Sequence, residues 1–141
     1  MKSLFIVLIA FLMVSCGSNE PKPINLNTDM CDFCKMTIAN GKFGSELITT
    51  KGRYYKFDDV ACMIQFAKSN QTPVNHFFVN DYLKENELFP AEKCFFLKGG
   101  IINSPMRGNL AAFSSINEQK KFQFKLNAEP MTWQQVYDSY K

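Results

Sequence analysis

The fold of this chain is decided by residues 53–67, which read Arg-Tyr-Tyr-Lys-Phe-Asp-Asp-Val-Ala-Cys-Met-Ile-Gln-Phe-Ala. The first five of these residues are β-prone, and Asp58 and Asp59 then provide an N-cap. Apolar residues follow at the spacing of one helix face, namely Val60, Met63, Ile64 and Ala67. The stretch therefore predicts a strand that passes directly into a helix, which we expect to continue to Asn70.

Further β-prone segments flank this strand and helix. Residues 44–50 are joined to residues 53–57 by Lys51-Gly52, a pattern typical of a tight hairpin. After Pro73 comes the strand-like run 76–79. Together these segments predict a β-β-α-β unit.

A second unit of the same kind is predicted in the C-terminal half, with strands over residues 93–97 and 110–113. Two helix starts match the capping-box pattern, in which Ser or Thr is followed three residues later by Glu or Gln. These are Ser115 with Glu118, for a helix to about residue 126, and Thr132 with Gln135, for a last helix. The sequence thus predicts an α+β domain made of two small β-β-α units packed side by side.

The composition limits the functions that are open to the chain. Apolar residues make up 46% of its 141 residues, and 14 Phe, 5 Tyr and 1 Trp can fill a core. The 16 Lys and Arg against 13 Asp and Glu form no basic block, which argues against nucleic acid as a partner. His76 is the only histidine, which argues against a His-rich metal site and against a Ser-His-Asp triad.

Residues 1–15 are expected to be a lipoprotein signal peptide. A basic start precedes an unbroken apolar run over residues 4–14, which is shorter than the roughly 20 residues that span a bilayer. Residues 13–16, Met-Val-Ser-Cys, resemble a bacterial lipobox, in which cleavage leaves a diacylated cysteine, here Cys16, at the new N-terminus. The alternatives are an uncleaved anchor and secretion with a free Cys16.

A flexible tether is expected over residues 16–28, which are polar, contain two prolines and show no periodicity. The globular domain is then expected over residues 29–141. On this interpretation the lipid on Cys16 attaches the protein to a membrane of the cell envelope, facing the periplasm or the outside.

The four other cysteines fall into two kinds. Cys62 lies in a helical pattern and Cys94 in a strand-like run, so both are interpreted as small buried hydrophobic residues. Cys31 and Cys34 differ because they lie in a polar segment with charged neighbours.

Residues 29–36, Asp-Met-Cys-Asp-Phe-Cys-Lys-Met, bring two thiols and two thioethers together. Soft sulfur ligands of this kind suit Cu(I). In an extended chain, Cys34 and Met36 would point to one side and Cys31 to the other. A turn between the two cysteines would instead bring both thiols to one ion.

The spacing of Cys31 and Cys34 is also compatible with two other functions. The pair could form the redox centre of a thiol–disulfide oxidoreductase, or a disulfide staple in a small envelope domain. Zinc fits less well, because a structural zinc site needs four ligands and the chain has no second C-x-x-C and no nearby histidine.

Several motifs resemble the NosL family, whose members are copper-binding lipoproteins associated with nitrous oxide reductase maturation. The matching segments occur in the same order over roughly residues 29–125, after the lipobox. They are residues 34–36 (Cys-Lys-Met), 55–59 (Tyr-Lys-Phe-Asp-Asp), 78–82 (Phe-Val-Asn-Asp-Tyr), 91–96 (Ala-Glu-Lys-Cys-Phe-Phe), 104–108 (Ser-Pro-Met-Arg-Gly) and 111–113 (Ala-Ala-Phe). The resemblance implies two similar β-β-α halves and a Cu(I) site.

The resemblance also implies a set of ligands. Cys34 and Met36 match the family's Cys-x-Met segment, and Met106 lies in a turn that matches a Pro-Met-Gly-like motif and is the third contributor. Many relatives have Gly where Lys35 stands and a histidine a few residues later, where residues 40–44 of this chain read Asn-Gly-Lys-Phe-Gly. Cys31 is then an additional thiol, which either replaces a missing ligand or caps the site through a disulfide.

The resulting interpretation is a lipid-anchored Cu(I) chaperone that is not an enzyme. Its expected cargo is copper, and its expected partner is nitrous oxide reductase or the maturation machinery of that enzyme. His76, the only imidazole, is a further ligand candidate, although it is placed at the start of a strand.

Overall fold

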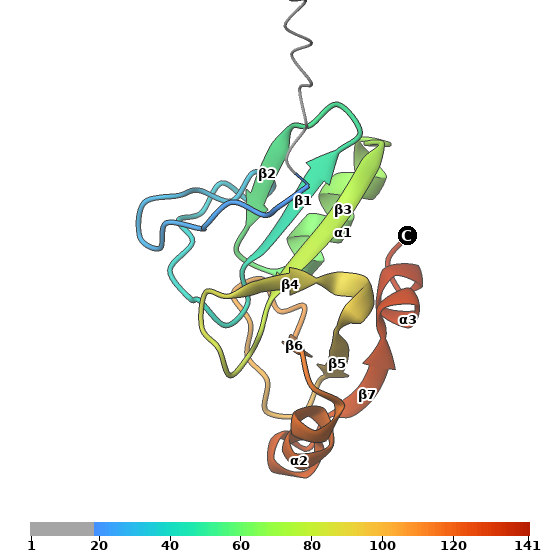
Figure 1. The fold of residues 1–141 in the computed structure, drawn as a ribbon. Helices are drawn as coiled ribbons and strands as arrows, with labels where there is room; N and C mark the ends of the chain where they lie inside the picture. The colour runs from blue at the N-terminus through green and yellow to red at the C-terminus, as the bar shows by residue number, and fades with distance from the viewer. Residues whose placement is uncertain (1–18) are drawn as a thin grey trace, which may run out of the picture.

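The computed structural model describes residues 19–141 and folds into two similar units with one helical extension (Figure 1). In chain order the elements are β1 (Ser45–Thr49), β2 (Tyr54–Phe57), α1 (Val60–Ser69), β3 (Val74–Asn80), β4 (Leu88–Pro90), the 3-10 helix η1 (Ala91–Lys93), β5 (Phe95–Lys98), β6 (Leu110–Phe113), α2 (Ile116–Leu126), β7 (Glu129–Thr132) and α3 (Trp133–Asp138). The predicted α+β class and the pair of β-β-α units are confirmed.

The first unit has the predicted hairpin, helix and returning strand. Its antiparallel sheet has the order β2-β1-β3-β4, so β1 is a central strand. Gly52 takes a φ of 75° in the hairpin turn, a conformation that side chains with a Cβ rarely adopt. Asp59 is the N-cap of α1, and its side chain accepts a hydrogen bond from the backbone N–H of Ala61. Figure 1 shows α1 behind the sheet.

The second unit repeats this topology in a sheet of order β6-β5-β7, with α2 between β6 and β7. The short strands β4 and β7 were not predicted, and the strand predicted over residues 93–97 begins only after η1, at Phe95. In β7, Pro130 lies on an edge strand, where a missing backbone N–H is tolerated.

The two predicted capping boxes have different outcomes. The box of Thr132 and Gln135 is confirmed at the start of α3, with both of its hydrogen bonds formed. Ser115 is the N-cap of α2 as expected, but its side chain makes no capping hydrogen bond, so the capping box with Glu118 is wrong.

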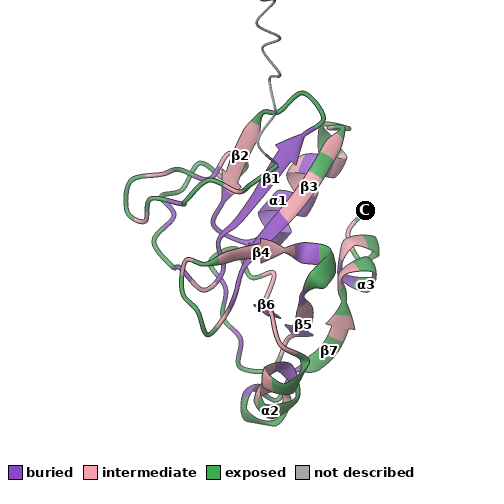
Figure 2. Ribbon diagram, in the orientation of Figure 1, coloured by how far each residue is buried: buried purple, intermediate pink, exposed green. Residues whose placement is uncertain are grey.

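The main core lies between the two units and beneath α1 and α3. Figure 2 shows that β1 and α1 are largely buried, whereas α2 is largely exposed. Asp81 links the units, because it follows β3 and its carboxylate accepts hydrogen bonds from the backbone N–H and the hydroxyl of Ser114, just after β6. Burial of Asp81 raises its pKa, but these hydrogen bonds outweigh the burial and hold the pKa below its usual value.

The segment expected as a tether, residues 16–28, packs against the domain in its described part, mainly through Ile24. Ile24 is buried in the core, and the backbone N–H of Lys22 donates to the carboxylate of Glu46 in β1 at 2.8 Å. The segment therefore covers the face of the first sheet opposite α1, and the globular part begins earlier than residue 29. The expected signal peptide and Cys16 lie outside the described residues.

Within residues 19–141, no helix combines the length and the apolar composition that crossing a membrane requires.

Candidate metal centre

The segment with Cys31 and Cys34 is a tight turn and not an extended strand. Met30 pairs with Thr37 across the turn, and the backbone N–H of Cys31 donates to the carbonyl of Met36 at 2.8 Å. Lys35 closes the turn with a φ of 66°. The argument from strand parity, which placed Cys31 on the opposite side from Cys34, is therefore wrong, and the alternative of a turn between the two cysteines holds.

The edge of the first sheet fixes the position of this turn. Asp32 donates its backbone N–H to the carbonyl of Lys56 in β2, and its carboxylate accepts the backbone N–H of Lys56, both at 2.8 Å. The turn thus extends the sheet beyond its edge strand β2. Because β2 leads into α1, the turn comes to lie against the N-terminus of that helix.

Four side chains converge at this point: those of Cys31, Cys34, Asp58 and Cys62. One ligand atom from each, three Sγ atoms and a carboxylate oxygen, lies within 4.8 Å of all the others. Asp58 comes from the junction between β2 and α1, and Cys62 is the third residue of α1. Cys34 is half-buried and the other three are buried. We call this group the sulfur cluster.

Hydrogen bonds tie the members of the sulfur cluster together. The thiol of Cys34 lies 3.5 Å from both carboxylate oxygens of Asp58, to which it donates. The backbone N–H of Cys34 points at the sulfur of Cys31, also at 3.5 Å. All four cysteines of the described chain are free thiols, so the structure contains no Cys31–Cys34 staple.

These contacts shift the pKa values of the thiols in opposite directions. A hydrogen bond from Cys62 lowers the pKa of Cys31, and this effect outweighs burial, which raises it. Burial raises the pKa of Cys34, and the hydrogen bond with Cys31 raises the pKa of Cys62. The cluster is thus polarised around the sulfur of Cys31.

The interpretation of Cys62 and Cys94 as buried residues is confirmed, but it was incomplete for Cys62. The sulfur of Cys62 belongs to the cluster, whereas that of Cys94 does not. A signal for this was present in the sequence: the N-cap at Asp59 places Cys62 in the first turn of a helix, a position typical of functional cysteines.

The two expected methionine ligands are exposed. Met36, two residues after Cys34, is 58% exposed, and Met106 is 40% exposed. The loop of Met106 is held against the start of α1 by the second carboxylate oxygen of Asp59. This oxygen accepts a hydrogen bond from the hydroxyl of Ser104 at 2.6 Å and another from the backbone N–H of Met106 at 3.0 Å. Met106 is therefore anchored to the residue that follows Asp58.

Gly108 allows this loop to approach α1 closely. A Cβ at this position would lie 2.6 Å from the carboxylate of Asp59 and 2.7 Å from the Cβ of Ala61, which is too close for either contact. The Ser104–Gly108 segment, one of the motifs that carry the family resemblance, thus packs against the N-terminus of the same helix that carries Cys62.

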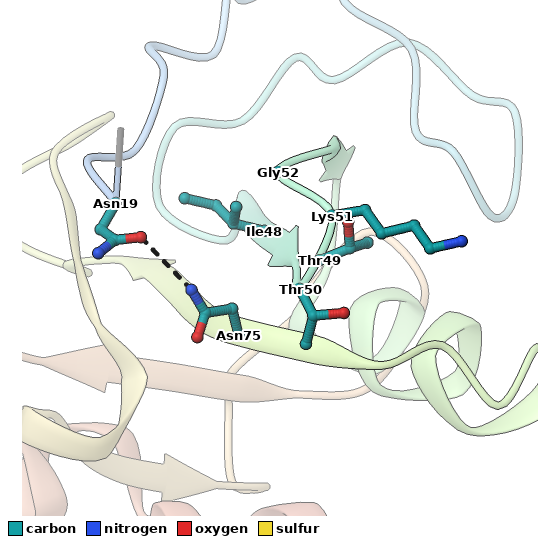
Figure 3. Close-up of a pocket in the computed structure, with 7 residues that line it drawn as sticks. All are labelled: Asn19, Ile48, Thr49, Thr50, Lys51, Gly52 and Asn75. Atoms are coloured by element: carbon teal, nitrogen blue, oxygen red, sulfur yellow. Dashed lines mark hydrogen bonds between the residues drawn. The ribbon is translucent and has the colours of Figure 1, made fainter. Parts of the chain in front are cut away.

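His76 is not brought to the cluster. It lies in β3 opposite Ile48 of β1, and so faces the side of the sheet away from α1. A cavity of about 240 Å³ near the hairpin turn offers hydroxyl and amide groups, among them Asn75, which bonds to Asn19 (Figure 3). Its lining contains no sulfur, so the cysteine turn remains the candidate metal centre.

Comparisons with known proteins place the chain among proteins of this fold. The crystal structure of the copper chaperone NosL from Shewanella denitrificans is similar, with a TM-score of 0.71 and 17% sequence identity over 83% of this chain and 95% of that chain. No curated protein sequence matches closely enough to serve as a relative. Among protein-family models, that of NosL matches residues 23–140. Because this match spans most of the sequence, the chain belongs to the NosL family.

Proposed function

We propose that the protein is a Cu(I) carrier of the bacterial cell envelope. It takes up one Cu(I) ion through Cys34, Met36 and Met106, with Cys31 as an additional thiol, and passes the ion to a cuproenzyme. The observation that carries this proposal is the turn that sets the sulfurs of Cys31 and Cys34 close together, two residues before the exposed Met36, in a chain of the NosL family.

The chemistry of the donors supports a soft, exchangeable cargo. Thiolates and thioethers favour Cu(I), while oxygen ligands suit harder ions. Thioethers are neutral and need no deprotonation, so Met36 and Met106 can bind and release the ion without proton transfer. Because both are exposed, an acceptor protein could replace them one at a time, and transfer by ligand exchange requires no catalytic group.

The finer parts of the proposal concern location and partner. We expect residues 1–15 to be removed as a lipoprotein signal and Cys16 to carry the lipid that holds the protein at the membrane. The partner is nitrous oxide reductase or its maturation machinery. This assignment is supported by the NosL family and by the fold shared with a protein described as a copper chaperone.

The burial of Cys31 argues against a thiol–disulfide oxidoreductase. In such an enzyme the cysteine with the lowered pKa is the attacking nucleophile and must be accessible. Here the cysteine with the lowered pKa is Cys31, which is fully buried, while Cys34 has a raised pKa and is the more exposed of the two.

A titration with Cu(I) under anaerobic, reducing conditions tests the proposal. With a chromophoric Cu(I) chelator as competitor, we expect tight binding of one ion per chain and weaker binding in Met36→Leu. Copper-loaded protein should then lose its ion to an apo-cuproenzyme. Reduction of insulin disulfides that is insensitive to Met36→Leu, without copper binding, would instead identify an oxidoreductase.

A further inference from the structure

Cys62 has no role in the exposed set of ligands, yet its sulfur lies within 4.8 Å of those of Cys31 and Cys34. We propose that these three cysteines form an inner site that retains the ion, while Met36 and Met106 form an outer position where the ion enters and leaves. This inference rests on the proposed function for the identity of the ion. The three-sulfur site itself rests on geometry alone.

The spacing of the three sulfurs suits a single metal ion. Sulfur ligands lie about 2.3 Å from a bound ion such as zinc, so three sulfurs around one ion in a plane are about 4 Å apart. The observed upper limit of 4.8 Å therefore requires only small rotations of side chains. The sulfurs come from two separate elements, the cysteine turn and α1, both fixed by backbone hydrogen bonds.

The charge around the site favours a cation. The carboxylate of Asp58 is buried beside the sulfurs, and none of the ion pairs formed within residues 19–141 involves it. A bound cation would supply the missing counter-charge. Cys94 provides the contrast, because it is equally a buried free thiol but lies outside any such cluster in the described chain.

Exposure decreases from the outer position to the inner one. Met36 and Met106 are exposed, Cys34 is half-buried, and Cys31 and Cys62 are buried. Cys34 is shared by both positions, so the ion can move inward by exchanging the two thioethers for the thiolates of Cys31 and Cys62. Copper stays Cu(I) throughout, and each thiol that binds it releases one proton to solvent.

Two measurements on the protein test this inference. X-ray absorption of the Cu(I) form counts the sulfur ligands, and absorption of the Cd(II) form reports thiolate-to-metal charge transfer independently of copper. We expect three thiolates in both forms of the wild-type protein, and two in Cys62→Ser.

The affinity for Cu(I) gives a second test. Loss of a partner that only orients a metal ligand costs about 10–100-fold in affinity, so Cys62→Ser and Cys62→Ala should weaken Cu(I) binding by at least about tenfold. Cys94→Ala is the matched control and should bind as tightly as wild type.

Each outcome separates the inner site from the proposed function. Equal Cu(I) affinities of the Cys62 variants and Cys94→Ala, or fewer than three thiolates in the wild-type protein, would overturn the inner site and leave the copper carrier standing. Three thiolates on Cd(II) without competition for Cu(I) would establish the site and overturn copper as its cargo. Failure of either Cys62 variant to fold would not weaken the test, because the wild-type thiolate count decides the matter by itself.

Discussion

The two units of this protein have the same topology but differ at the point where strand meets helix. In both, a hairpin is followed by a helix and then by a strand that pairs with the first strand of the hairpin. The last hairpin pair before each helix is Ser45 with Phe57 in the first unit and Phe95 with Phe113 in the second. Counting from these pairs gives a residue-by-residue correspondence between the halves.

This correspondence shows which residues distinguish the candidate metal centre from the same position in the second unit. Asp58 of the first unit corresponds to Ser114 of the second, and Cys62 corresponds to Glu118. In the first unit the start of the helix is buried, and the cysteine turn packs against it. In the second unit only Gln119 and Leu126 of α2 are buried. A shared scaffold thus acquires sulfur chemistry only where the start of the helix is covered by other segments.

The largest effect is expected from the cysteine turn. Because the turn brings both sulfurs to one place, Cys31→Ser and Cys34→Ser should each weaken Cu(I) binding by more than about 100-fold, beyond the loss caused by removing a merely orienting partner. Cys94→Ser in the second unit should leave Cu(I) affinity within about twofold of wild type. Competition titrations of the three variants measure this. Normal binding by Cys31→Ser would remove Cys31 from the site, although the turn places its sulfur there.

The two N-caps are expected to differ strongly in their contribution to stability. Asp59 caps α1 and also holds Ser104 and Met106, whereas the side chain of Ser115 makes no capping hydrogen bond. Asp59→Ala should lower the free energy of unfolding by about 3 kcal/mol, because the helix loses its cap and the buried hydroxyl of Ser104 loses its acceptor. Ser115→Ala should change it by less than about 0.5 kcal/mol. Urea denaturation of both variants gives these values, and equal losses would contradict the assigned difference.

A buried carboxyl group in the first unit should make stability depend on pH. Glu46 stands where the second unit has Phe96, and burial raises its pKa to about 7. Between the two pKa values, the folded state keeps the carboxyl group of Glu46 protonated, whereas the unfolded state has already released this proton. Stability therefore falls as pH rises from about 4.5 to 7, by about 2 kcal/mol.

The variant Glu46→Gln should remove this slope, while Glu129→Gln, at an exposed position of β7, should retain it. Denaturation midpoints measured at pH 5 and pH 7.5 are enough for the comparison. A slope that persists in Glu46→Gln would assign the pH dependence to another group.

The sequence was sufficient for most of the regular elements and insufficient for the site. Strand β2 and helix α1 follow from β-prone residues, an N-cap and helical spacing, all of which are local. The convergence of Cys62 on Cys31 is not local, because it depends on Asp32 binding the edge of β2, a contact between residues 24 positions apart. Short edge strands such as β7 were missed for the same reason, since their pairing partners and not their composition define them.

The smallest effect on stability is expected at two residues with a left-handed backbone conformation. Lys35 ends the cysteine turn, and Asn127 ends helix α2 of the second unit. A side chain in this conformation costs about 1–2 kcal/mol, but Gly also loses about 0.5–1 kcal/mol more backbone entropy on folding. Lys35→Gly should therefore raise the free energy of unfolding by about 0.5–1 kcal/mol. Asn127→Gly should raise it less, because Asn tolerates this conformation better than Lys does. Thermal denaturation of both variants measures the difference.

Lys35→Gly should bind Cu(I) as wild type does, because Gly preserves the turn that aligns Cys31 with Cys34. A loss of affinity in Lys35→Gly would show that the lysine side chain itself, which donates to the carbonyl of Asp32, holds the turn in place.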